Sequence, residues 1–165
     1  MERFFATNNL NMKIKITTFI AGCCLAAALP LTLTAQKDEK AIKTVINHFF
    51  EGMEKGDTTL LLSTCMPEPV MQTWMKDKQG EMQLYTERFS DFVAFVGEPK
   101  KDKFKEEIEF DAIHSEASLA TVWTPYTFYL NGKVSHCGTN SFQLVKTSQG
   151  WKIQYIIDTR RKGCK

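Results

Sequence analysis

Few side chains in this sequence have types suited to catalysis, and His136 is the most useful of them. A histidine with an unperturbed pKa near 6.5 can act as a general base at neutral pH. Such a base abstracts a proton from a substrate that a hydrogen-bond donor holds in place, and Tyr155 is a candidate donor. Alternatively, His136 is structural and bonds to Asn140 or Thr127 at the rim of a pocket.

Other candidate sites carry less chemistry. Asp158, Arg160, Arg161 and Lys162 are typical of an ion-paired strand end, because neighbouring side chains on a strand point to opposite faces and do not converge on one anion. His136 and Cys137 are adjacent on a strand and therefore do not form a catalytic pair. The sequence contains no CxxC motif and no Cys/His cluster at zinc spacing, so we expect no metal and no cofactor.

The elements that must position these residues are strands in the second half of the chain. Alternation and β-branched content predict a four-stranded antiparallel meander over residues 104–114, 119–130, 134–146 and 151–159. Asn131-Gly132 is the strongest hairpin signal, because both positions of a type I′ turn need a positive φ. Ser148-Gln149-Gly150 predicts the next turn.

Register then assigns side chains to faces. A two-residue turn at Asn131-Gly132 pairs Trp123 with Asn140 and Thr127 with His136. The following turn pairs Phe142 with Tyr155. The predicted core face therefore ends in polar groups next to aromatic walls, as a small-molecule pocket does, and it holds no carboxylate.

Pro125 leaves one point open, because a proline inside a strand indicates an edge or a bulge. A bulge there would move Tyr126 and Phe128 from the outer face into the pocket. Without it, the outer face carries Tyr126, Phe128, Cys137, Ile156, Asp158 and Arg160. The residues that we expect around a ligand are Trp123, Tyr126, Thr127, His136, Asn140, Tyr155 and Asp158.

Helices precede the sheet. Apolar residues at helical spacing predict a helix over 38–55, and Asp57 can cap a second, short helix. A short strand is expected over 70–74, and Thr86 is expected to cap a third helix that ends at Gly97. The fold class is therefore α+β, with three helices packed in the concavity of a strongly bent, mainly antiparallel sheet.

The N-terminus carries an apolar segment, 17–35, preceded by Lys13 and Lys15. This pattern predicts a secretory signal peptide over residues 1–35, with translation starting at Met12. The remaining domain is then 36–165, located in the periplasm or secreted. The alternatives are an uncleaved membrane anchor and a lipoprotein attached through Cys23.

Composition excludes several classes of protein. With 43% apolar and 24% charged residues, the chain is neither disordered nor collagen-like. Segment 36–165 contains 18 basic and 18 acidic side chains, so we expect no nucleic-acid binding.

After signal cleavage the cysteines are Cys65, Cys137 and Cys164, an odd number that leaves at least one free thiol. Three states stay open: a Cys65–Cys164 bridge, no bridge, or a Cys137–Cys164 bridge. The last requires Gly163 to fold the tail back, because four extended residues span about 13 Å.

Two segments carry a resemblance to a known family: Phe49-Phe50-Glu51-Gly52-Met53-Glu54-Lys55-Gly56-Asp57, and Phe142-Gln143-Leu144-Val145-Lys146 with Gly150-Trp151-Lys152-Ile153. Over about 38–160 the chain resembles the nuclear-transport-factor-2-like (SnoaL-like, cystatin-like) superfamily of cone-shaped α+β proteins. The resemblance implies that fold, and a homodimer through the convex sheet face. It implies no specific activity, because fold does not determine function.

Two functions are therefore compatible with the sequence. The first is an exported protein that binds a small apolar ligand, with no membrane contact after cleavage. The alternative is an isomerase, dehydratase or hydrolase that uses His136 as general base.

Overall fold

A computed structural model describes residues 29–164, with side chains from Ala35 onward. Most of the predicted signal peptide, residues 1–28 with Met12 and Cys23, lies outside the described structure. The side chains of residues 29–34 are not described either. In the described part of the chain, no helix combines the length and the apolarity that a membrane crossing needs. The described residues 38–164 form one compact unit, and the packing and side-chain contacts below lie within it.

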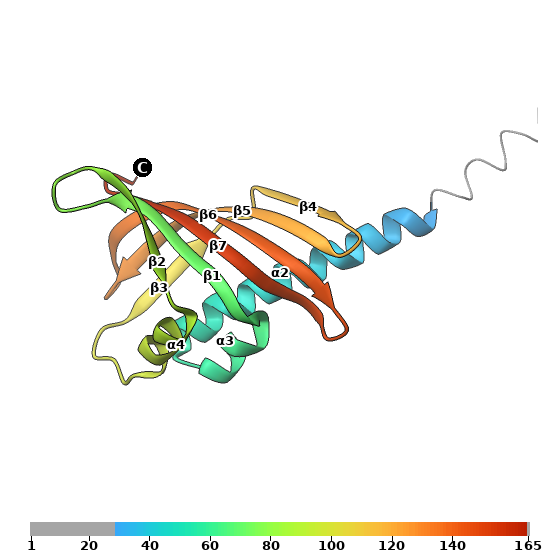
Figure 1. The fold of residues 1–165 in the computed structure, drawn as a ribbon, viewed down its shortest axis with the longest axis horizontal. Coiled ribbons are helices and arrows are strands. Elements are labelled where there is room, and N and C mark those ends of the chain that lie inside the picture. Colours follow the sequence, from blue (N-terminus) through green and yellow to red (C-terminus); the bar gives the residue numbers. More distant parts are fainter. Residues whose placement is uncertain (1–28, 165) are drawn as a thin grey trace, which may run out of the picture. The chain divides into compact units, whose positions relative to one another are not determined.

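The described elements are α2 (Leu29–Lys55), α3 (Thr58–Thr64), β1 (Cys65–Lys76), β2 (Met82–Glu87), α4 (Phe89–Gly97), β3 (Phe104–Ile108), β4 (Ala112–Glu116), β5 (Leu119–Leu130), β6 (Lys133–Thr147) and β7 (Gly150–Arg161). The sheet order is β2-β1-β7-β6-β5-β3, and β4 also pairs with β5. Only the β1–β7 pair is parallel; the other pairs are antiparallel. Figure 1 shows the bent sheet with α3 and α4 on its concave side. The predicted α+β class is confirmed.

The helices form where the apolar spacing predicts them. Ile42, Ile46 and Phe49 lie on one stripe of α2 and are buried in the core with residues of β6. Asp57 caps α3, since its Oδ1 accepts a hydrogen bond of 2.9 Å from the backbone N–H of Leu60.

Three predicted boundaries are wrong. Thr86 does not cap α4; it belongs to β2, and Arg88 stands at the cap position without a side-chain hydrogen bond. The strand predicted over 70–74 runs from Cys65 to Lys76 and includes two prolines. They are tolerated because they lie where the β1–β7 register shifts, before β2 pairs on the other side. The strand predicted over 104–114 is split into β3 and β4.

The hairpin turn at Asn131-Gly132 is where the sequence places it, with φ of 54° and 77°. The register beyond it differs from the prediction by one residue. Ser135 is an unpaired extra residue on β6, so Phe128 pairs with His136 and Trp123 with Ser141. Pro125 itself pairs regularly with Thr139, and the expected bulge at this proline is absent.

A second bulge lies on β7, where Gln154 is the extra residue. As a consequence Phe142 pairs with Ile156, not Tyr155, and Asn140 pairs with Asp158. Each bulge exchanges the two faces of the strand beyond it. Asp158 and Arg160 therefore turn to the concave face, and the prediction of a core face without carboxylates is wrong.

A disulfide joins Cys137 and Cys164, whose Cα atoms lie 5.8 Å apart. Gly163, with φ of 78°, folds the tail back as this pairing requires. Cys65 is a buried free thiol whose burial raises its pKa to about 11. The predicted alternatives, a Cys65–Cys164 bridge or no bridge, are wrong.

Candidate functional site

The concave face of the sheet encloses a cavity of about 370 Å³ between the strands and the helices α2 and α4. Seven of its lining residues are phenylalanines, which makes most of the wall apolar. The full lining is Phe49, Phe50, Met53, Met71, Gln72, Thr73, Glu87, Phe92, Phe95, Val96, Lys100, Phe104, Glu106, Tyr126, Phe128, His136, Asn140, Phe142, Ile156, Asp158 and Arg160.

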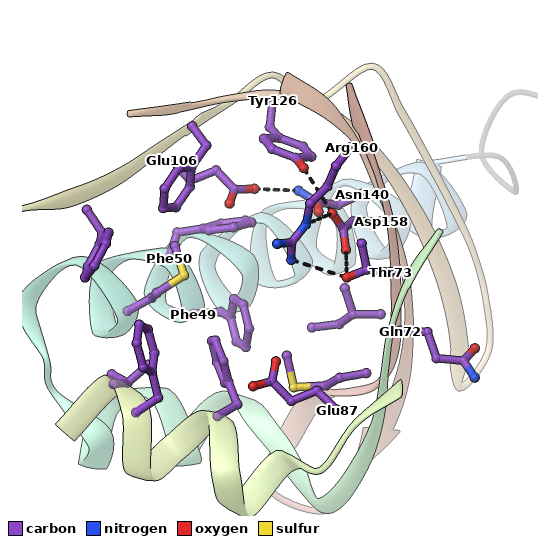
Figure 2. Close-up of a pocket in the computed structure, with 18 of the residues that line it drawn as sticks. Phe49, Phe50, Gln72, Thr73, Glu87, Glu106, Tyr126, Asn140, Asp158 and Arg160 are labelled. Carbon is purple, nitrogen blue, oxygen red and sulfur yellow. Dashed lines mark hydrogen bonds and ion pairs between the residues drawn. The ribbon is translucent and has the colours of Figure 1, made fainter. Parts of the chain in front are cut away.

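A polar cluster forms one side of this cavity, and Asp158 lies at its centre (Figure 2). The Asp158 carboxylate accepts hydrogen bonds from the Thr73 hydroxyl at 2.5 Å and from the Tyr126 hydroxyl at 3.0 Å. Arg160 Nε lies 3.1 Å from the same carboxylate, and its Nη2 donates to Thr73 Oγ1 at 3.2 Å. Asp158 is thus fully paired and holds the other three side chains in position.

Gly138 allows Tyr126 to reach this cluster. It pairs with Tyr126 on one side and with Arg160 on the other. A Cβ at position 138 would lie 1.7 Å from the Thr159 carbonyl oxygen and 2.9 Å from the Tyr126 ring. Only glycine permits this close approach of strand, ring and carbonyl.

Beside the cluster, Thr124 is completely buried, and its hydroxyl has no hydrogen-bond partner in the described structure.

Glu106 is another carboxyl group that lines the cavity. It lies on β3, and Figure 2 shows its side chain pointing across the cavity toward Asn140. Asn140 Nδ2 donates to Glu106 Oε1 at 2.8 Å. Burial raises the pKa of Glu106 to about 7, and the nearby Asp158 charge adds to this effect, against the opposing hydrogen bond from Asn140. Near neutral pH this group can therefore both accept and donate a proton.

His136 also lines the cavity, but it lies against aromatic rings. Its ring stacks on Phe128 at 4.8 Å between centroids and meets Tyr126 edge-on at 5.8 Å. Nδ1 lies 3.3 Å from Ser135 Oγ, so the predicted bond to Asn140 or Thr127 is replaced by a bond to its chain neighbour. Burial, followed by the Arg160 charge, lowers the pKa of His136.

The structure brings four of the seven predicted ligand-binding residues together in the cavity: Tyr126, His136, Asn140 and Asp158. The other three lie elsewhere because of the register shifts. Trp123 is 48% exposed, and Thr127 lies outside the cavity lining. Tyr155 donates to Gln72 Oε1 at 2.7 Å and does not line the cavity. The expected His136–Tyr155 pair therefore does not form.

The sequence reasoning missed Glu106, Thr73, Glu87 and Arg160 as cavity residues. One signal was available for Glu106, because it shares the alternation of Ile108 and Phe110, two apolar residues that pack against the core. Thr73 and Glu87 come from β1 and β2, and every residue of β2 is exposed, so no apolar pattern marked that strand. In residues 29–164, no group of three His, Cys, Asp or Glu side chains is close enough to hold a metal ion.

No family model matches the sequence, and no curated protein matches it. Solved structures do. An NTF2-like protein of unknown function from Shewanella baltica matches with a TM-score of 0.60 at 15% identity, over 77% of this chain and 96% of that one. An NTF2-like protein with a cystatin-like fold from Novosphingobium aromaticivorans matches with a TM-score of 0.63 at 12% identity, over 82% and 90%.

The chain has the NTF2-like fold. The resemblance to the NTF2-like superfamily is thereby confirmed for the fold. A proposed dehydratase of the NTF2-like family from Streptomyces avermitilis also matches, with a TM-score of 0.58 at 12% identity, over 78% of this chain and 99% of that one. At these identities the likeness concerns the fold, and the function must be argued from the cavity.

Proposed function

We propose that this NTF2-like protein binds a small, largely apolar molecule in the cavity, with a polar end against the Glu106–Asn140 side. The observation that carries this proposal is a phenylalanine-walled cavity of about 370 Å³ with its polar groups gathered on one side. Its volume lies within the roughly 300–1,000 Å³ of small-molecule sites, and apolar walls with a few placed polar groups are typical of them.

We also propose that the protein works after export. Segment 1–35 has the pattern of a signal peptide. The Cys137–Cys164 disulfide supports this, because disulfides persist mainly in oxidising compartments.

Native mass spectrometry of the protein purified from its own compartment tests the binding function. We expect a co-purifying small mass, lost when Val96→Phe fills the cavity. Val96 lines the cavity and is only 4% exposed, so the added ring must enter that space. A matched control is Val134→Phe, the same substitution at a position that is 53% exposed and does not line the cavity. A wild-type protein that carries no ligand and is not stabilised by any neutral aromatic probe would contradict the proposal.

A second candidate function is proton transfer, as in an isomerase or dehydratase. Its support is the Glu106 carboxyl, whose pKa of about 7 suits a general base, while His136 is the alternative base. Enzyme-dependent deuterium exchange of a C–H acid probe, measured by NMR, tests it. Loss of exchange in Glu106→Gln but not in His136→Gln would assign the base to Glu106; no exchange in the wild type would remove this candidate.

For assembly we propose a homodimer through the convex face. The outer-face residues named from the sequence, Tyr126, Phe128 and Ile156, line the cavity and cannot serve. The exposed apolar side chains Trp74, Leu84 and Trp123 replace them in this proposal. Light scattering after size exclusion should report two chains in the wild type and one in Trp123→Lys; a monomeric wild type at tens of micromolar would refute the dimer.

A further inference from the structure

Among the described residues, the two cationic side chains that line the cavity each have a partner within the protein. Arg160 is already paired with Asp158 through Nε at 3.1 Å. The other cationic side chain, Lys100, lies 3.8 Å from the Glu98 carboxylate, and its Nζ is 3.5 Å from the centroid of the Phe95 ring. Both positive charges therefore have partners of their own.

Glu106 has no such partner in the described structure. Its single hydrogen bond comes from Asn140, a neutral amide, and no ion pair of the described residues includes it. A carboxylate that loses water contacts without gaining a cation is destabilised in its charged form. A positively charged ligand would supply the missing charge at this position.

The rest of the wall suits a cation as well. Phe49, Phe50, Phe104 and Phe128 line the cavity, and a ring face attracts a cation within about 6 Å of its centroid. The ammonium of Lys100 on Phe95 shows that a ring of this wall already accepts such a group.

We propose that the ligand is a small organic amine, bound as its ammonium cation between the Glu106 carboxylate and the phenylalanine walls. This inference rests on the proposed binding function and names the chemical class of the ligand. An amine, an alcohol and a carboxylate with the same ring system differ only in the group that would face Glu106. Comparing their affinities therefore tests the preference for an amine separately from the binding function itself.

The other groups that face Glu106 do not supply an equivalent site. From β7 come Asp158 and Arg160, which pair with each other. From β5 comes Tyr126, a phenol that is neutral at pH 7, and from β6 comes His136, whose pKa is lowered by burial. Hydroxyl and amide groups come from Thr73 on β1 and Asn140 on β6, whereas α2 and α4 contribute apolar side chains. The remaining carboxyl is Glu87 of β2, an exposed residue whose carboxyl group is partly shielded from water at the cavity wall, which raises its pKa.

The test uses three probes with one ring system: 2-naphthylmethylamine as cation, 2-naphthylmethanol as neutral analogue and 2-naphthoate as anion. Calorimetry on the wild-type protein at pH 8 should give the amine an affinity at least about tenfold above the alcohol, as expected for a hydrogen bond to a charged group. Its affinity should fall about tenfold from pH 8 to pH 6, as Glu106 takes up a proton.

Glu106→Gln should abolish both the preference for the amine and its pH dependence, while the alcohol binds as before. Glu107→Gln is the matched control, because Glu107 lies next on β3, is exposed and pairs with Lys105 at 2.7 Å; it should change neither. Equal or tighter binding of the alcohol or the carboxylate to the wild type would overturn the amine proposal and leave the binding function standing. If none of the three probes binds, both the amine proposal and the binding function are refuted. The comparison of the probes uses only the wild-type protein, so it does not depend on whether a variant folds.

Discussion

The raised pKa of Glu106 makes the stability of the fold depend on pH in a definite direction. The pKa is about 7 in the folded protein against 4.5 for the unperturbed group, so the folded state holds the proton more tightly. The contribution of this group to the free energy of unfolding is therefore greatest below pH 4.5, and it is lost as the pH rises from 4.5 through 7. The difference of about 2.5 units corresponds to roughly 3 kcal/mol of unfolding free energy at full deprotonation.

Glu106→Gln tests this directly. The glutamine keeps the acceptor for Asn140 but cannot ionise, so it should be more stable than the wild type by about 3 kcal/mol at pH 8 and nearly equal to it at pH 4.5. The assay is urea unfolding of both proteins at four pH values, comparing their free energies at each. Titrations of groups that do not interact with Glu106 cancel in this difference. A difference that does not change between pH 4.5 and pH 8 would refute the raised pKa and the burial argument behind it.

Three other predictions follow from the same region. Gly138→Ala should abolish the folded state or cost more than about 3 kcal/mol, because the new Cβ would collide with the Thr159 carbonyl; a thermal melt within a few degrees of the wild type would contradict this. Thr124→Val should keep or raise stability by up to about 1 kcal/mol, since it removes a buried hydroxyl without a partner, and a clear loss in urea unfolding would reveal a partner for it. Cys164→Ser should lower stability by about 3–4 kcal/mol, the chain-entropy value for a bridge of sequence separation 27, whereas the already reduced protein should not respond to the substitution.

The sequence predicted most of the architecture because its signals are local. The stripe of α2, the Asp57 cap and the positive φ values of Asn131 and Gly132 each depend on residues within a few positions. The strand β2 was missed because all its residues are exposed, and their burial does not alternate along the strand.

The site was harder to predict because it depends on two bulges. Ser135 and Gln154 have ordinary side chains, and nothing in the sequence marks them as extra residues. Ser135 shifts the pairing of β6 with β5, so Thr124 replaces Trp123 opposite Asn140 and Trp123 lies outside the cavity. Gln154 moves the rest of β7 to the other face, which places Asp158 inside it. Pro125 carried the expected bulge signal yet pairs regularly with Thr139, and its carbonyl accepts the Glu109 N–H where β3 ends.

A crystal structure with 2-naphthylmethanol bound tests the central claim most directly, because this neutral probe depends on the cavity and not on the charge of the ligand. The account predicts that the naphthyl ring lies among Phe49, Phe50 and Phe128 with its hydroxyl within hydrogen-bond distance of Glu106. An unoccupied cavity at saturating probe, or a probe bound only on the convex face, would contradict it.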